Sequence, residues 1–214
     1  VFSTGDELIV LDIDATKENK APNLKIIKSL ADECRMPFCY GGGITSVEEA
    51  VNIISLGVEK IALSHSALTN IKLCEEIGDV IGKQSVVVVI DVKKKKFLRG
   101  YDIYTHNGTK KSDWKLNDFI SKIEEIGIGE IVINSIDNDG VMKGYDLPLI
   151  EKIRKQCSMP ITVLGGAGSL GDIKKIFNKF KIIGAAAGSL FVFKGKYRAV
   201  LISYPNREER KPIY

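Results

Sequence analysis

The chain has 214 residues and a mass of 23.6 kDa, with 44% hydrophobic residues, 27% charged residues and a formal net charge of +4. This composition is ordinary for a globular protein, and no apolar run reaches the ~18 residues that a membrane-spanning helix needs. The lysines are scattered, apart from a run at 93–96, so neither nucleic acid nor membrane is indicated as a partner. No signal-peptide pattern is found, which predicts a cytoplasmic location.

Short β-branched runs alternate with helix-period segments along the whole chain. Most of the runs are continuously apolar, as expected for parallel strands that are covered on both faces. The predicted strands are Glu7–Asp12, Pro37–Gly41, Lys60–Leu63, Ser85–Asp91, Glu130–Ile136, Ile161–Gly165 and Ile182–Ala187. The predicted helices are Asn23–Glu33, Val47–Leu56, Ile71–Ile77, Leu116–Ile126, Leu149–Lys155 and Asp172–Phe180. Residues 93–111 are the exception, because residues 101–105 alternate like one arm of a hairpin.

Two segments that lie 124 positions apart share a glycine-rich pattern. Residues 41–45 read Gly-Gly-Gly-Ile-Thr and residues 165–169 read Gly-Gly-Ala-Gly-Ser, and the segments 60–64 and 184–188 fall at the same offset. An interval this long indicates two half-barrels of four βα units rather than a solenoid. The predicted fold class is therefore α/β, a (β/α)8 barrel built from two half-barrel repeats.

Only seven strands are found where two half-barrels would give eight. The eighth belongs before Glu7, where residues 1–5 alone remain. A barrel that lacks a strand exposes two edges and an open core. We therefore expect residues 1–214 to form a single barrel domain whose N-terminal βα unit, of roughly 35–40 residues, precedes Val1.

In such barrels the ligand lies at the carboxyl ends of the strands, and two of these ends are glycine-rich. Glycine lets backbone N–H groups approach an anion, and the helix that follows adds partial positive charge. Because the two groups lie half a barrel apart, they predict a ligand with a phosphate at each end; the alternative is that they only form tight turns. The first group is Gly42, Gly43, Ser64 and His65, and the second is Gly165, Gly166, Gly168, Gly188 and Ser189.

Several carboxylates also close a strand or lie just beyond one. The alternative role of Asp12, Asp14 and Asp137 is to cap the N-terminus of the next helix, and Asp139 lies beside the last of them. Asp91 ends the most apolar strand of the chain and is not followed by a helix. It is the weakest candidate for capping and therefore the strongest candidate for a catalytic acid or base.

Charged residues stand at the opposite ends of three strands, namely Glu7, Lys60 and Glu130. Alone, each would be an ordinary solvated charge, and the period of a strand does not orient a side chain at its first residue.

The four cysteines lie far apart, without a Cys-x-x-Cys pair, which indicates reduced thiols that are buried or half-buried. A zinc site with His65 or His106 is the alternative, but the spacing of metal ligands is absent. No metal or other cofactor is predicted.

The sequence resembles the cyclase subunit of imidazole glycerol phosphate synthase over nearly all of its length. The runs that carry the resemblance are 6–16, 41–44, 86–91 with Lys93, and 130–146. The resemblance implies a barrel that receives ammonia from a glutaminase subunit docked on its N-terminal face, as a heterodimer. It also implies a phosphorylated ligand, a ribulose-phosphate formimino intermediate that this family cleaves and cyclises in histidine biosynthesis.

The resemblance further assigns roles by position. Asp91 matches the catalytic aspartate of the fifth strand, while the other catalytic aspartate lies on the absent first strand. Glu7, Lys60 and Glu130 match three of the four charges that gate ammonia, with Glu59 beside them at the partner interface. Positions around the two phosphate sites are matched by Gly43, Gly166 and Ser189, and the substrate loop by Asp137, Asp139 and Gly140.

Two motifs depart from the family pattern. The usual Ser-Ile-Asn-Thr reads Ala-Leu-Ser-His at 62–65, and the usual Asp-Arg-Asp-Gly-Thr reads Asp-Asn-Asp-Gly-Val at 137–141. With these changes, the sequence resembles a paralogous branch of the family that is linked to sugar amidation for surface polysaccharide, including lipopolysaccharide. In that branch the barrel passes ammonia to a separate sugar amidotransferase. The alternative is a histidine-pathway cyclase, a lyase. The retained Asp91 and the retained glycine loops favour the enzyme, whereas the altered first phosphate cradle and the lost arginine favour the conduit.

Overall fold

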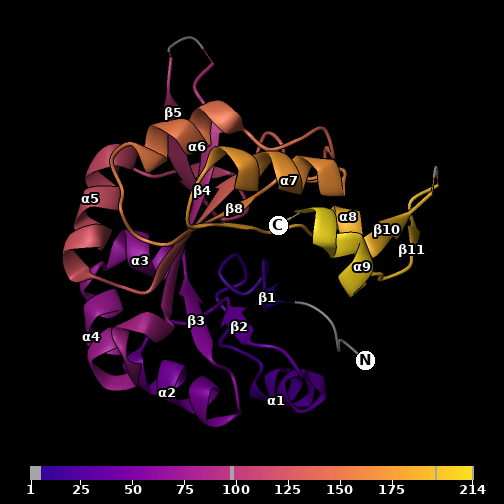
Figure 1. Ribbon diagram of the computed structural model, residues 1–214. Coiled ribbons are helices and arrows are strands. Elements are labelled where there is room, and N and C mark those ends of the chain that lie inside the picture. The colour runs from indigo at the N-terminus through magenta and orange to yellow at the C-terminus, as the bar shows by residue number, and fades with distance from the viewer. Residues whose placement is uncertain (1–5, 97–98, 196, 214) are drawn as a thin grey trace.

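The computed structural model describes residues 6–96, 99–195 and 197–213, and Figure 1 shows a parallel sheet curled with helices around its outside. Within these residues the parallel strands follow the order β1-β2-β3-β4-β7-β8-β9. They are β1 (Leu8–Leu11), β2 (Phe38–Gly41), β3 (Lys60–Leu63), β4 (Val86–Lys94), β7 (Glu130–Ser135), β8 (Ile161–Leu164) and β9 (Ile183–Ala185). Neighbours along the chain are neighbours in the sheet, which confirms the predicted (β/α)8-barrel class.

Helices connect the parallel strands and cover the outer face of the sheet. The predicted helices correspond to α1 (Leu24–Glu33), α2 (Val47–Ser55), α4 (Lys72–Ile81), α5 (Leu116–Ile126), α6 (Leu147–Arg154) and α7 (Leu170–Lys179). The short elements that the sequence did not predict are α3 (His65–Thr69), η1 (Lys83–Ser85), α8 (Ser189–Val192), α9 (Arg207–Arg210), η2 (Lys211–Ile213) and the strands β6 (Lys110–Lys111), β10 (Phe193–Lys194) and β11 (Ala199–Val200).

The fourth strand corrects one boundary. The prediction ended this strand at Asp91, but β4 continues to Lys94. The reason is the hairpin arm β5 (Tyr101–Thr105), which pairs antiparallel with the extra residues, so that Asp91 faces Tyr104 and Lys94 faces Tyr101 in register. Asp91 therefore lies inside a strand rather than at its end.

Apolar side chains form one layer outside the sheet and another inside it. The outer layer joins the strands to the helices and includes Ile27, Ile53, Ile77 and Ile123, all fully buried. The inner layer is a separate cluster whose buried members are Cys39, Ala62, Val87, Val89 and Val132, with Ile9, Leu11 and Leu164 packed against it. Since alternate residues of a strand face the same side, the inner cluster marks which residues point into the barrel.

The C-terminal segment connects the two edges of the sheet. The Tyr204 hydroxyl donates to the Asp6 carboxylate at 3.2 Å, and the Arg210 guanidinium pairs with the same carboxylate at 2.7 Å. Ile213 is buried in the outer apolar layer, where η2 packs against α7. Residues 1–5 and the βα unit expected before them lie outside the described residues, and that unit stays a prediction.

The cysteine thiols are free, with Cys39, Cys74 and Cys157 buried and Cys34 half-buried, as predicted. Among the described residues, no helix is long and apolar enough to cross a membrane.

Candidate functional site

An ion-paired cluster lies at the N-terminal end of the barrel. The Lys60 ammonium donates to the Glu7 carboxylate at 2.9 Å and to the Glu130 carboxylate at 3.0 Å. These residues begin or precede β3, β1 and β7, so three strands bring the charges together. Their side chains are only 14–29% exposed, which separates them from ordinary solvated surface charges. We call these three residues the floor cluster.

One cation is shared by two carboxylates in the floor cluster, and the pKa shifts reflect this. Burial raises the pKa of the Glu7 carboxyl above its ordinary value, more than the Lys60 ammonium lowers it. Burial alone would lower the pKa of Lys60, yet hydrogen bonds to both carboxylates hold it above its ordinary value. Glu59, expected at the same interface, is exposed beside the cluster and adds its negative charge to the environment of Glu7.

Above the floor cluster the barrel interior is apolar. Along β4 the inward residues are Val87, Val89 and then Asp91, and along β7 they are Glu130, Val132 and then Asn134. Burial raises the pKa of the inward Cys39 thiol, so this thiol stays neutral. The interior column therefore joins a charged lower end to a polar upper end through side chains that carry no charge.

Asp91 and Asn134 form the upper end of this column. They are paired in register across β4 and β7, and the Asn134 amide nitrogen donates to the Asp91 carboxylate at 2.9 Å. Burial raises the pKa of Asp91, the hydrogen bond from Asn134 opposes this shift, and the nearby Asp139 carboxylate adds to it. A carboxyl group held in this way is suited to donate or accept a proton.

Other predicted carboxylates have backbone partners. Asp12 accepts from the Asp14 and Ala15 N–H groups at 3.2 and 3.1 Å, so it caps a turn and not the next helix, α1, which Asn23 caps. Asp137 accepts from the Lys94 N–H at 2.8 Å and so holds the extension of β4. Asn138, at the position of the lost arginine, donates to the Gly144 carbonyl at 3.1 Å, so it stabilises its own loop.

The first glycine group lies beside a cavity of about 610 Å³ at the carboxyl ends of β2 and β3. Gly42, Gly43 and His65 line it, while Ser64 is the residue that precedes α3. Gly42 has a φ of +128°, and a Cβ there would lie 2.6 Å from the Asp12 carbonyl oxygen. Tight packing thus requires glycine at this position, which agrees with the alternative that these glycines form tight turns. The cavity nevertheless lies open beside it.

Two histidines face each other at this cavity. His65 and His106 contact edge to face, with ring centroids 4.6 Å apart, and both line the cavity wall. The Thr105 hydroxyl lies between them. The sequence singled out His65, but His106 was considered only as a zinc ligand, because nothing in the sequence shows that the hairpin returns to the barrel mouth. Among the described residues, no three His, Cys, Asp or Glu side chains form a possible metal site.

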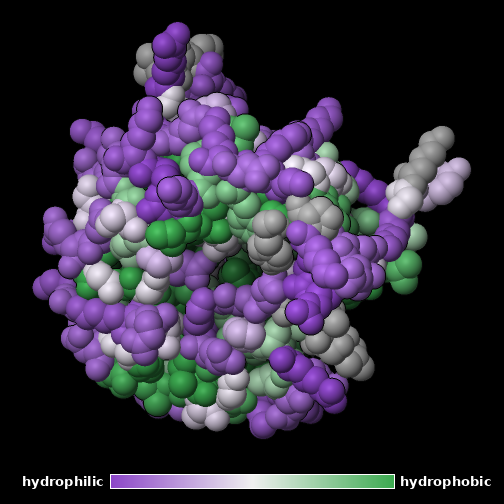
Figure 2. All heavy atoms as spheres, in the orientation of Figure 1, coloured by the Kyte–Doolittle hydropathy of each residue, from purple (hydrophilic) through white to green (hydrophobic). Residues whose placement is uncertain are grey.

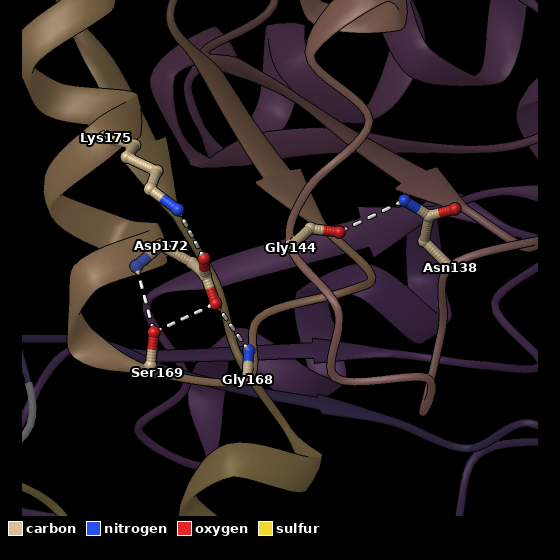
Figure 3. Close-up of polar contacts among 6 residues, drawn as sticks. All are labelled: Asn138, Gly144, Gly168, Ser169, Asp172 and Lys175. Atoms are coloured by element: carbon tan, nitrogen blue, oxygen red, sulfur yellow. Dashed lines mark hydrogen bonds and ion pairs between the residues drawn. The ribbon is translucent and has the colours of Figure 1, made fainter.

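The second glycine group is packed against the loop that precedes α6 (Figure 3). A Cβ on Gly166 would lie 2.1 Å from the Gly144 carbonyl oxygen, and one on Gly168 would lie 2.2 Å from that of Met142. Gly165 is similarly tight against the carbonyl of Ser135. The loop of Asp139 and Gly140 reaches the last members of the group, since a Cβ on Gly140 would lie 4.0 Å from Ser189 Oγ and Gly188 precedes α8.

Helix capping uses one backbone amide in each of the glycine-rich segments 41–45 and 165–169. The Gly168 N–H donates to the Asp172 carboxylate at 3.2 Å, and the Thr45 N–H donates to the Glu49 carboxylate at 2.7 Å. The two carboxylates are the third residues of α7 and α2, and they lie 123 positions apart, one fewer than the offset of the glycine pattern. Burial would raise the pKa of Asp172, but its hydrogen bonds hold the pKa below its ordinary value.

Comparison with known proteins identifies relatives of the whole chain. Residues 3–198 match the family described as histidine biosynthesis protein.

The curated relatives fall into two levels of similarity. Two of them, from Leptospira interrogans (HisF) and Vibrio vulnificus (hisF3), are named as imidazole glycerol phosphate synthase subunits. Both names carry a provisional qualifier. The first is 52% identical over 98% of this chain and 82% of its own length, and the second is 52% identical over 96% and 79%. The imidazole glycerol phosphate synthase subunit HisF of Petrotoga mobilis is 38% identical over 91% of this chain and 76% of its own length.

Proposed function

The chain belongs to the histidine biosynthesis protein family, and on this premise we propose that it is the ammonia-receiving barrel subunit of a glutamine amidotransferase complex. Its partner is a glutaminase that docks on the N-terminal face as a heterodimer, around Glu59 and the floor cluster. The ammonia serves a separate sugar amidotransferase in surface polysaccharide (lipopolysaccharide) synthesis.

The observation that carries this proposal is the floor cluster below an apolar barrel interior. Lys60 lies between Glu7 and Glu130 and closes the lower end of the barrel axis. Because it bonds to both carboxylates, it can release one of them and keep the other. The neutral inner cluster above it suits NH3 and disfavours a charged ammonium ion, because burying an unpaired charge is costly. Figure 2 shows a hollow near the middle of the face in view, with hydrophobic residues at its depth and hydrophilic residues around it.

The upper site supports delivery rather than cyclisation. His65 takes the place of a small hydroxyl residue in the first phosphate cradle, and Asn138, in place of an arginine, is bonded to its own loop. The chain is also more similar to the relatives with provisional or numbered names than to the Petrotoga mobilis subunit. We propose that the two glycine groups still hold a phosphorylated ligand, with the cavity beside β2 and β3 as its main contact.

The second candidate is a cyclase of the histidine pathway, and Asp91 favours it. The carboxylate faces the upper end of the interior column, Asn134 positions it, and its pKa is raised toward the range of a general acid or base. Ammonium-dependent turnover of the ribulose-phosphate formimino intermediate that Asp91→Asn removes would support this candidate. In the pH–rate profile of this turnover, the rate should fall on the acid side at a pH above the ordinary aspartate pKa, because the pKa of Asp91 is raised and protonation disables a base.

Deletion of the gene in the organism that encodes it tests the proposal. We expect growth without histidine to continue, while mass spectrometry of the surface polysaccharide shows a free carboxyl where the sugar amide stood. A histidine requirement with unchanged polysaccharide would contradict the proposal and establish the cyclase instead.

A further inference from the structure

Three side chains from two separate elements form a continuous chain of contacts at the cavity. His65 is the first residue of α3, Thr105 is the last residue of β5, and His106 follows it. Thr105 Oγ1 lies 3.1 Å from His65 Nδ1 and 3.2 Å from His106 Nδ1. Thr105 is itself buried, at 6% exposure, so the hydroxyl is fixed between the two rings. We call these three residues the histidine pair and its bridge.

The bridge dictates how protons are distributed over the pair. A hydroxyl carries one hydrogen, so Thr105 donates to one Nδ1 atom and accepts from the other. In the neutral state the rings then hold opposite tautomers: one presents an Nε2 lone pair and the other an Nε2–H group. One added proton makes both Nε2 atoms donors, and this single positive charge is shared through the bridge.

The surroundings of the pair favour an anion. Lys17 and Lys20 line the same cavity, and the positive charge of Lys110, on β6, lowers the pKa of His65. Glu49 lines the cavity and accepts from Thr45, while Glu18 lies outside the lining and offsets the charge of Lys20, with which it pairs. Burial, His106 and Lys110 all lower the pKa of His65, which favours the neutral form of this ring when no anion is bound.

We propose that the histidine pair and its bridge bind the phosphoryl group of a phosphomonoester in this cavity, and that they take up one proton as they do so. This rests on the proposed function, in which the first glycine group contacts a phosphorylated ligand. A dianionic phosphoryl group offers acceptor oxygens to both Nε2–H groups, and its charge favours the protonated pair. Recognition at this end of the barrel then depends on imidazoles in addition to backbone amides.

Glycerol phosphate is a suitable probe, because it carries a phosphomonoester and little else. Calorimetric titration at pH 7 in two buffers with different ionisation enthalpies gives both the affinity and the number of protons taken up. We expect the wild-type chain to take up close to one proton. His106→Ala and Thr105→Val should each weaken binding by about tenfold or more, with proton uptake near zero. Thr105→Val keeps the volume of the side chain and removes only the bridge.

Thr109→Val is the matched control, because its hydroxyl lies on the same hairpin but donates to the His106 carbonyl, outside the cavity lining. It should bind and take up protons as the wild type does. Wild-type binding without proton uptake, no wild-type binding, or unchanged binding by both His106→Ala and Thr105→Val would overturn the inference. Equal affinity for glycerate would overturn the choice of a phosphoryl group. Failure of the ammonia-delivery function would show separately, in the gene deletion.

Discussion

Lys60→Ala is expected to lower the glutamine-dependent activity of the full complex by about tenfold or more, while activity with free ammonium salts stays nearly unchanged. Without the ammonium group, Glu7 and Glu130 would face each other without a counter-charge, and one must move or take up a proton. The entrance at the floor cluster would then no longer open and close through changes in the ion pairs of Lys60. Ammonia from glutamine would escape to solvent, whereas ammonia supplied from solvent does not depend on the seal.

The measurement is the ratio of the two rates, mutant against wild type, with complex formation checked by size exclusion. Lys83→Ala is the matched control, because Lys83 is also half-buried but donates to the Ile126 backbone carbonyl at 2.9 Å. An unchanged ratio for Lys60→Ala in an intact complex would show that the floor cluster has only a structural role.

Asp146→Ala is expected to destabilise the fold by about 2–4 kcal/mol, because a helix cap and the acceptor of a half-buried hydroxyl are lost together. The Asp146 side chain is 1% exposed, accepts from the Tyr101 hydroxyl at 3.0 Å and pairs with Lys94 at 3.2 Å. It also caps α6 by accepting from the Leu149 N–H at 3.2 Å. Its loss leaves the Tyr101 hydroxyl without this acceptor and uncaps α6, while β5 stays paired with β4.

Thermal unfolding measures this effect, and a fall in Tm of roughly 4–16 °C corresponds to that range for a domain of this size. Asp102→Ala is the control on the same hairpin, because the Asp102 side chain is 19% exposed and pairs with Lys95 and Lys111, so its loss should cost about 1 kcal/mol or less. Equal losses for the two variants would contradict the special role of Asp146.

The regular part of the fold could be predicted because apolar periodicity reports burial directly. Lys60–Leu63 and Leu116–Ile126 match β3 and α5 to the residue. The end of β4 could not be predicted, since its last residues are held by the β5 arm rather than by their own apolar character. The position of segment 203–213 could not be predicted either, because the segment is polar and shows no clear hydrophobic period. It is held by contacts with Asp6, at the other end of the chain.

The site divides in the same way. Glu7, Lys60 and Glu130 were identified by resemblance, because no sequence period orients side chains at the first residue of a strand. Asn134 was missed, although it lies opposite Asp91, because only the register of β4 and β7 places it there.

Isotope tracing tests the central claim, that ammonia passes through the barrel, most directly. The full complex receives glutamine labelled with 15N at the side-chain amide together with an excess of unlabelled ammonium chloride, and mass spectrometry follows the nitrogen in the amidated product. Passage through a sealed interior predicts that the product keeps the label of the glutamine amide almost undiluted. A product whose nitrogen matches the unlabelled ammonium pool would mean that ammonia travels through solvent, which contradicts the account.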